Sequence, residues 1–279
     1  MRRFWNSFKR AGLPAHIGIV IILIFLFAAV FAPWLAPYGE SEVVDPVPWA
    51  SPSESGTLLG LDQLGRDLYT RVLYGARNTI ALALGITCLA FFMGMVAGFF
   101  AAVVGRWVDH LLSRCVDIIM AFPTLFFALI ALSIFGTSIP VMVFVIATLD
   151  ATRVYRISRA LAMDINVMEY VEVARLRGEG LWWIMRREIL PNTLTPLLAE
   201  FGLRFCFVFL FISSLSFLGI GIQPPAADWG AMVRENGVAI TYGIFTPLVP
   251  AAAIAVLTIA VNLVVDWFLR KTAGLREEY

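Results

Sequence analysis

The residue types that most often do chemistry in proteins are few and scattered in this sequence. The two histidines, His16 and His110, lie in different regions near the ends of apolar segments, and no two cysteines have CxxC spacing. A zinc site needs three or four clustered His, Cys or carboxylate ligands. The spacing therefore predicts no metal site, and Cys88, Cys115 and Cys206 are interpreted as small apolar packing residues.

The lysines exclude a second kind of chemistry. A phosphate-binding loop places a lysine directly after a glycine, whereas Lys9 follows Phe8 and Lys271 follows Arg270. The chain is therefore not expected to be an enzyme: no catalytic, cofactor-binding or metal-binding residue is predicted, and ATP hydrolysis by this chain is excluded by that route.

Five ionisable residues lie within or at the ends of apolar segments: Asp117, Asp150, Glu200, Arg204 and Asp266. Glu200 and Arg204 are four residues apart, so on a helix they share a face and are expected to form an ion pair. A contact with another helix or with a partner protein is the alternative. None of the five is placed as a proton relay, although ionisable groups inside a membrane are often functional.

The composition identifies the elements that must carry these residues. The chain has 279 residues, of which 60% are hydrophobic and 15% charged, and its mean hydropathy is +0.83. Soluble domains have about a quarter charged residues, so the sequence predicts an all-α integral membrane protein. The net charge of +1 gives no sign of a nucleic-acid surface.

Six apolar stretches are long enough to cross a bilayer. They are residues 17–36, 79–104, 116–136, 139–157, 197–222 and 246–268. The first is too long for a signal peptide and is interpreted as a retained signal anchor. Pro123 is expected to kink the third, and Gly94 with Gly98 in the second is expected to pack inside the bundle rather than to form a dimer.

The distribution of Lys and Arg predicts the orientation. With six spans, 16 of the 21 basic residues fall on the side of the termini and 4 on the other, while Arg204 lies within a span. Short cytoplasmic segments carry the excess of positive charge, so the N and C termini and the long connection 158–196 are predicted to be cytoplasmic.

The connection 158–196 is polar but does not have the composition of a flexible linker. Val167, Tyr170, Val171 and Ala174 have the spacing of one face of an amphipathic helix. Gly178 is expected to end that helix in the left-handed conformation. A second short helix is predicted around Leu181, Ile184 and Met185, then a turn at Pro191, with Thr195 and Pro196 starting the fifth span.

Val173 and Leu176 would then project from the opposite face of the first helix, beside Glu172. Exposed apolar side chains of this kind indicate a docking surface for a soluble protein. A solvated loop that joins two spans is the alternative.

This segment resembles the "EAA" loop of permease subunits in ATP-binding-cassette importers, which reads E-A-A, three residues, G, nine residues, I-x-L-P. Glu172, Val173 and Ala174 take the first three places and Gly178 the next, and Leu190 and Pro191 take the last two. Val173 departs from the central alanine and Glu188 from the isoleucine. The resemblance implies a coupling helix that fits a groove on an ATPase subunit.

Two further segments are similar to the dipeptide, oligopeptide and nickel branch of these permeases. They are GLDQLGRDLYTRVLYGARNTI at residues 60–80 and SLSFLGIGIQPPAADWGAMV at residues 214–233. The resemblance implies a type I importer permease fold: residues 1–75 would form the cytoplasmic tail, first transmembrane helix and periplasmic loop, and residues 76–279 the five-span core with its coupling loop at about 158–196.

The partners that the resemblance implies are a second homologous permease, two cytoplasmic ATPases that use the ATP, an extracytoplasmic substrate-binding protein and membrane lipid. The expected function is ATP-driven import of peptides or a related small solute across the bacterial inner membrane. An ion-gradient-driven secondary transporter is the alternative. The predicted periplasmic loop 37–78, with six acidic residues, is interpreted either as a spacer or as a contact for the binding protein.

Overall fold

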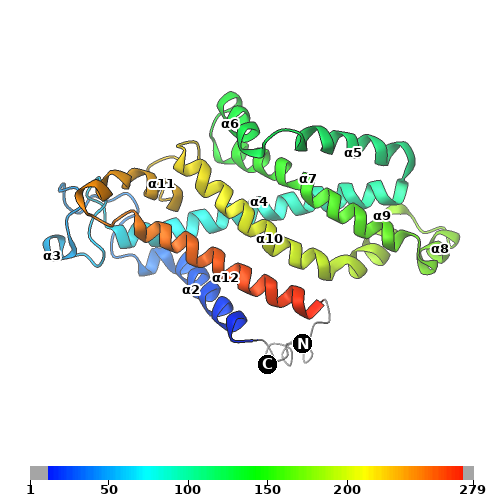
Figure 1. Ribbon diagram of the computed structural model, residues 1–279, viewed down its shortest axis with the longest axis horizontal. Helices are drawn as coiled ribbons and strands as arrows, with labels where there is room; N and C mark the ends of the chain where they lie inside the picture. The colour runs from blue at the N-terminus through cyan, green and yellow to red at the C-terminus, as the bar shows by residue number, and fades with distance from the viewer. Residues whose placement is uncertain (1–11, 273–279) are drawn as a thin grey trace. The chain divides into compact units, whose positions relative to one another are not determined.

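The computed structural model describes residues 12–272, which are mainly helical, and the extended pairing within this range is limited to two isolated bridges. The longer helices are α2 (Leu13–Leu35), α4 (Leu68–Val104), α5 (Arg106–Met120), α6 (Thr124–Phe135), α7 (Ile139–Asn166), α10 (Leu190–Phe217) and α12 (Leu248–Thr272) (Figure 1). The shorter ones are α3 (Pro52–Ser55), α8 (Glu169–Leu176), α9 (Leu181–Ile184), the π-helix η1 (Met185–Ile189), α11 (Trp229–Glu235) and the 3-10 helix η2 (Gly237–Tyr242).

Helices dominate because a lipid-exposed backbone must satisfy its own hydrogen bonds. Among the described residues, four helices are long and apolar enough to cross a membrane: 13–35, 68–104, 181–217 and 248–270. The pair α5 and α6 would make a fifth. The first eighteen residues of α7 contain Asp150, Arg153 and Arg156, so this helix is more polar than those four helices. The all-α membrane fold is confirmed, and the count of six spans stays a prediction.

The third predicted span is not one helix. Helices α5 and α6 are bent by 88° at the break before Thr124, instead of forming the kinked span expected over residues 116–136. Proline disfavours the helical conformation in the residue before it and lacks a backbone N–H, and Pro123 is the N-cap of α6. At about 1.5 Å per residue, the twelve residues of α6 would be too short to span a bilayer alone.

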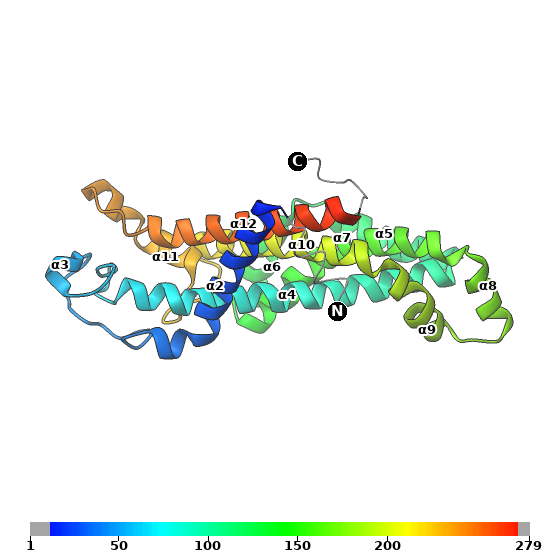
Figure 2. The same ribbon diagram turned by 90° about the horizontal axis from the view of Figure 1, so that it is seen from below.

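The described chain divides into two compact units, and α4 and α10 contribute residues to both. In the first unit α2 packs against α12 and crosses it obliquely in Figure 2. Gly18 permits this approach, because a Cβ there would lie 2.6 Å from the carbonyl oxygen of Ala260. Trp229 is fully buried in the same unit, with ring contacts to Phe25 and Phe209.

The second unit contains residues 85–136 and 140–205. Here α4 packs on α7 through Gly94 and Gly98, whose added Cβ atoms would lie 2.6 Å from Ala151 O and 2.8 Å from Tyr155 O. The prediction of packing inside the bundle is confirmed for this GxxxG pair. Helix α5 is joined to α7 by an ion pair from Asp109 to Arg159.

Candidate docking site

The segment predicted to dock a partner lies at one end of the second unit, where α8 projects past the ends of α5 and α7 in both views (Figures 1 and 2). Helix α8 begins after Met168 and ends at Leu176. Glu169 and Glu172 occupy its first turn and Arg175 its last. This order of charges favours the helix dipole at both ends.

Gly178 terminates α8 as predicted. Its φ is +78°, its N–H donates to Arg175 O at 2.9 Å, and Glu179 N–H donates to Ala174 O at 3.2 Å. This pair of bonds is a Schellman motif, which satisfies carbonyl groups at the helix end. No atom lies within 4 Å of a Cβ built on Gly178, so the backbone conformation rather than space requires glycine here.

The inner face of α8 is narrower than the sequence predicted. Val171 and Ala174 are fully buried, but Val167 is 81% exposed and Tyr170 41%. The prediction was wrong for Val167 because it precedes the N-cap, Met168, and so lies outside the helical repeat. Tyr170 is adjacent to the buried stripe and lies at its edge.

The buried stripe anchors α8 to the second unit. Val171 belongs to an apolar cluster with residues of α4, α7 and the segment after α8: Phe91, Phe99, Ala102, Val103, Val154, Ala162, Ile184, Met185, Ile189 and Leu197. Arg175 donates to Asn166, and Asn166 donates to Ala102 O at 3.1 Å. Arg177 lies over the Trp183 ring, 5.6 Å from its centroid. These contacts hold α8 and the residues directly after it against the second unit.

The outer face of α8, defined here as Glu172, Val173 and Leu176, is exposed. Val173 is 51% exposed and Leu176 81%. Leu176 thus presents almost its whole side chain at the end of a helix whose opposite side is buried. Ala174, the remaining member of the E-A-A triplet, faces inward and is fully buried.

The second helix predicted in this segment is not separate from the fifth span. Helix α9 continues through the π-helix η1 into α10, so residues 181–217 form one candidate span. Leu190 is half-buried and packs against the apolar cluster, and Pro191 is exposed within the helix. Pro191 was expected to mark a turn and Pro196 to start the span, and both predictions were wrong.

Several hydrogen bonds to backbone carbonyl groups accompany η1. Leu190 N–H donates to Met185 O, five residues back. Just beyond, Asn192 Nδ2 donates to Glu188 O at 2.6 Å, and Thr193 Oγ1 donates to Ile189 O at 3.0 Å. The helix therefore departs from regular α-helical bonding directly before Pro191.

Four of the five ionisable residues singled out in the sequence form ion pairs, whereas Asp266 of α12 is exposed. Glu200 and Arg204 form the expected ion pair at 2.8 Å, and Arg204 also lies 3.5 Å from Asp150 of α7. Asp117 of α5 pairs with Arg156 of α7 at 2.7 Å. Both the predicted contact within one helix and its interhelical alternative therefore occur at Arg204.

The loop between α2 and α4 holds a second charged group that sequence reasoning missed. Asp62 Oδ2 lies 2.6 Å from Arg66 Nε and 3.4 Å from Arg71 Nε. Glu235 of α11 lies 3.2 Å from Arg66 Nη2 and 3.7 Å from Arg71 Nη2. The side chains of Asp62, Arg66 and Arg71 are at most 5% exposed. We call these four residues the loop ion network.

Further bonds tie this loop to the segment that ends in α11. Asn236 Oδ1 accepts from Trp49 Nε1 at 3.1 Å and from Gln63 N at 3.0 Å. Asp228 caps α11 by accepting from Ala231 N at 2.9 Å, and burial raises the pKa of its carboxyl group. The loop is thus a folded element, and Asp62 and Asp67 face inward instead of presenting charge to a partner.

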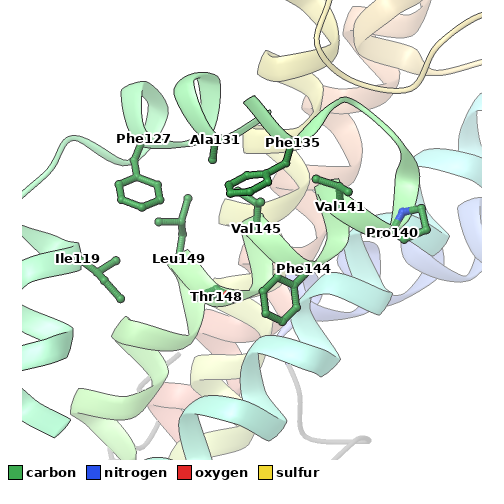
Figure 3. Close-up of a pocket in the computed structure, with 10 residues that line it drawn as sticks. All are labelled: Ile119, Phe127, Ala131, Phe135, Pro140, Val141, Phe144, Val145, Thr148 and Leu149. Carbon is green, nitrogen blue, oxygen red and sulfur yellow. The ribbon is translucent and has the colours of Figure 1, made fainter. Parts of the chain in front are cut away.

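A cavity of about 500 Å³ in the second unit is lined by residues of α5, α6 and α7 (Figure 3). Figure 3 shows Phe127, Ala131 and Phe135 on one side and Val145 and Leu149 on the other. Thr148 carries the single polar side chain of the ten lining residues. The cavity therefore suits apolar groups. Among residues 12–272, no group of three or more His, Cys, Asp or Glu could hold a metal ion.

Comparison with protein-family models matches residues 94–272 to the binding-protein-dependent transport system inner membrane component. Residues 1–49 match the N-terminal transmembrane domain of oligopeptide transport permease C. Both matches come from sequence, and together they extend over most of the chain.

Individual relatives align over nearly the full length. The di/tripeptide transport system permease protein of Pseudomonas aeruginosa is 32% identical, covering 95% of this chain and 89% of its own. The dipeptide transport system permease protein of Escherichia coli K12 is 34% identical, with coverage of 95% and 90%. A glutathione transport system permease protein of Pectobacterium atrosepticum is 29% identical, with coverage of 95% and 88%.

A solved structure has the same fold. The crystal structure of an amino acid ABC transporter with histidines aligns with a TM-score of 0.50 and 24% identity, covering 73% of this chain and 95% of that chain. At this level of identity, the likeness concerns the fold.

Proposed function

Because the chain belongs to the family of binding-protein-dependent transport system inner membrane components, we propose that it couples ATP hydrolysis by separate subunits to solute import through the outer face of α8. The chain is a multi-pass inner-membrane permease subunit of an ABC importer. An ion-gradient-driven secondary transporter is not favoured by these relatives. The family match over residues 94–272 carries the assignment.

The proposed complex contains this chain, a second homologous permease, two cytoplasmic ATPases and an extracytoplasmic binding protein. Peptides or a related small solute are the proposed cargo, because relatives are named for dipeptides, di/tripeptides and glutathione. The ATP is used by the partner subunits. We keep the division into residues 1–75 and a permease core at 76–279 as part of the proposal.

The proposed orientation places both termini in the cytoplasm and rests on the 16-to-4 distribution of basic residues. An alkaline phosphatase fused after Tyr279 is then expected to be inactive, since this reporter works only outside the cytoplasm. An active fusion would mean that the count of six spans is wrong.

The outer face of α8 has the properties that docking requires. It is exposed, partly apolar and carries a carboxylate, while the buried Val171 and Ala174 hold its backbone in place. A change confined to this face leaves the apolar cluster intact. Docking and folding can therefore be separated by mutation.

The test is Leu176→Asp in the complete transporter, with ATPase co-purification and transport as readouts. A new charge without a partner in a closed interface is expected to weaken binding by about 2 to 5 kcal/mol. Surface substitutions usually change stability by no more than about 0.5 kcal/mol, so the variant should reach the membrane at normal levels. Glu172→Arg is expected to act in the same direction through charge repulsion or a lost contact.

Leu58→Asp is the matched control, because Leu58 is a 71% exposed leucine of the loop between α2 and α4. It receives the same substitution outside the proposed interface and is expected to retain the ATPases. Normal ATPase retention and transport by Leu176→Asp would refute docking through this face. Equal loss of the ATPases from both variants would show that the substitutions disturb assembly of the transporter as a whole, and would not support docking through this face.

A further inference from the structure

The ion pair between α7 and α10 differs from those between α5 and α7 in the number of partners that each side chain has. Asp150 of α7 is 4% exposed at its side chain and lies 3.5 Å from Arg204 Nη1 of α10. It also lies 3.9 Å from Arg153, three residues along its own helix. Arg204 in turn lies 2.8 Å from Glu200, four residues earlier on α10. The group has two positive and two negative side chains.

Each member of the interhelical pair therefore has an alternative partner on its own helix. If α7 and α10 separated, Asp150 would keep Arg153, and Arg204 would keep Glu200. Separating a buried ion pair normally leaves an uncompensated charge in a medium of low dielectric constant. Here, the charges of Asp150 and Arg153 would still balance on α7, and those of Glu200 and Arg204 would still balance on α10.

The interhelical contact is longer than the contact within α10. Asp150, whose carboxylate oxygens are buried, lies 3.5 Å from Arg204 Nη1, whereas Glu200 lies 2.8 Å from Arg204 Nε. A Coulomb interaction falls off gradually with distance, so Asp150 would still attract Arg204 after a small change of spacing. Arg153 of α7 additionally donates to Thr124 of α6 at 3.3 Å. This bond joins the Arg153 side chain to α6 and not to α10.

The contacts of α5 provide the contrast. Asp109 pairs with Arg159 and Asp117 with Arg156, and across residues 12–272 these aspartates have no recorded ion pair on their own helix. Ser113 adds a hydrogen bond to the Tyr155 hydroxyl at 3.0 Å. Separation of α5 from α7 would leave these two aspartates without an ion pair on their own helix. Helix α7 thus carries one charged contact without alternative ion-pair partners on α5 and one, at Asp150, with such a partner on each helix.

We propose that Asp150, Arg153, Glu200 and Arg204 form an exchangeable ion cluster through which α7 and α10 change their spacing during the transport cycle. These two helices enter and leave the segment that carries α8, so a force on α8 acts on both. The inference rests on the proposed function, since it requires that α8 is moved by an ATPase. Within that function, it assigns the four residues a positioning role.

Two charge-balanced double variants of the complete transporter separate this role from plain structural support. Arg153→Gln with Glu200→Gln removes both alternative partners and keeps the interhelical pair. Asp150→Asn with Arg204→Gln removes the interhelical pair itself. Each double variant loses one positive and one negative charge, so the net charge is the same in both.

The measurement is the distance between spin labels at positions 163 of α7 and 198 of α10, where Met163 is 44% and Leu198 53% exposed. The native cysteines, Cys88, Cys115 and Cys206, are first replaced by alanine. The reconstituted transporter is compared without nucleotide and after trapping with ATP and vanadate. Transport and ATPase rates are recorded for the same samples, together with the melting temperature.

We expect the wild-type distance to change on trapping. The variant without alternative partners should show a smaller change and transport roughly tenfold slower, which corresponds to about 1.4 kcal/mol on the barrier, with no loss of melting temperature. The variant without the interhelical pair should keep the distance change. If the first double variant does not assemble, Glu200→Gln alone is expected to shift transport in the same direction by a smaller factor.

The proposal is overturned if the wild type hydrolyses ATP and transports without a distance change, or if both double variants behave alike. A wild type whose ATPase is not stimulated by loaded binding protein would instead contradict the proposed function, and the inference would fail with it. The conservative variant Glu200→Asp keeps the charge and is expected to retain more transport than Glu200→Gln.

Discussion

Two connections between apolar helices, the α8 segment and the loop between α2 and α4, are held in place by different forces. Helix α8 rests on the buried Val171 and Ala174 and leaves Val173 and Leu176 exposed. The loop contains the single-turn helix α3 and is held by the loop ion network and by Asn236. One connection has an apolar inner side and the other a charged one.

The difference teaches which substitutions each connection tolerates. An apolar stripe is non-directional, so we expect substitutions on the exposed outer face of α8 to leave its buried inner face and the fold intact. A buried ion network depends on every member, because losing one leaves another charge without compensation. We therefore expect the proposed docking and the folding of the chain to be separable by mutation in the α8 segment, but not in the loop.

The strongest test of this contrast is Asp62→Ala. The substitution leaves Arg66 and Arg71 buried with Glu235 as their remaining network partner, and removing one partner of a buried pair costs about 3 to 5 kcal/mol. We expect a large fall in thermal stability in detergent. Glu42→Ala, at an exposed carboxylate of the same loop, is the control, and an equal effect of both would contradict the structural role of the network.

Gly178→Val is expected to have the next largest effect. A β-branched residue is strained at φ +78°, and such backbone strain costs about 1 to 3 kcal/mol. ATPase retention should fall although the outer face of α8 is unchanged. Gly180→Val serves as the comparison, because Gly180 has an extended conformation with φ −75°. Equal retention by both variants would argue against a role for the left-handed turn.

The smallest expected effect is that of Trp49→Phe. The ring of residue 49 can still contact the Tyr242 ring, whose centroid lies 6.1 Å from that of Trp49. The Nε1 donor to Asn236 is lost, and a hydrogen bond contributes about 0.5 to 1.5 kcal/mol. Asn236 Oδ1 still accepts from Gln63 N. A modest fall in melting temperature, well below that of Asp62→Ala, would support charge as the main force in the loop. A fall as large as that of Asp62→Ala would indicate that hydrogen bonds stabilise the loop as strongly as its ion pairs do.

Local patterns in the sequence predicted the features that depend on neighbouring residues. The turn at Gly178, the pair Glu200 and Arg204, and the exposed Leu176 all follow from helical spacing and backbone preference. The packing of Gly94 and Gly98 against α7 was also predicted, because small residues allow helices to approach closely. These inferences need no knowledge of distant contacts.

Features formed across long sequence separations were not predictable in the same way. Glu235 lies 169 residues from Arg66, and Asn236 lies 187 residues from Trp49, so no spacing rule joins them. The pairing of Asp150 with Arg204 depends on how α7 packs against α10. Pro191 and Pro196 misled the assignment of the fifth span, because both lie inside the continuous helical segment 181–217.

The π-helix Met185–Ile189 also affects the direction in which α8 faces around the axis of α10. Its wider turn takes up about one residue more than an α-helical turn, and each residue of an α-helix rotates the chain by about 100°. Everything before η1, including α8, is therefore rotated about the axis of α10 relative to an uninterrupted helix. Deleting one residue within 185–189 would restore ordinary helical winding and turn the outer face of α8 away from its present direction, although no residue of that face had changed.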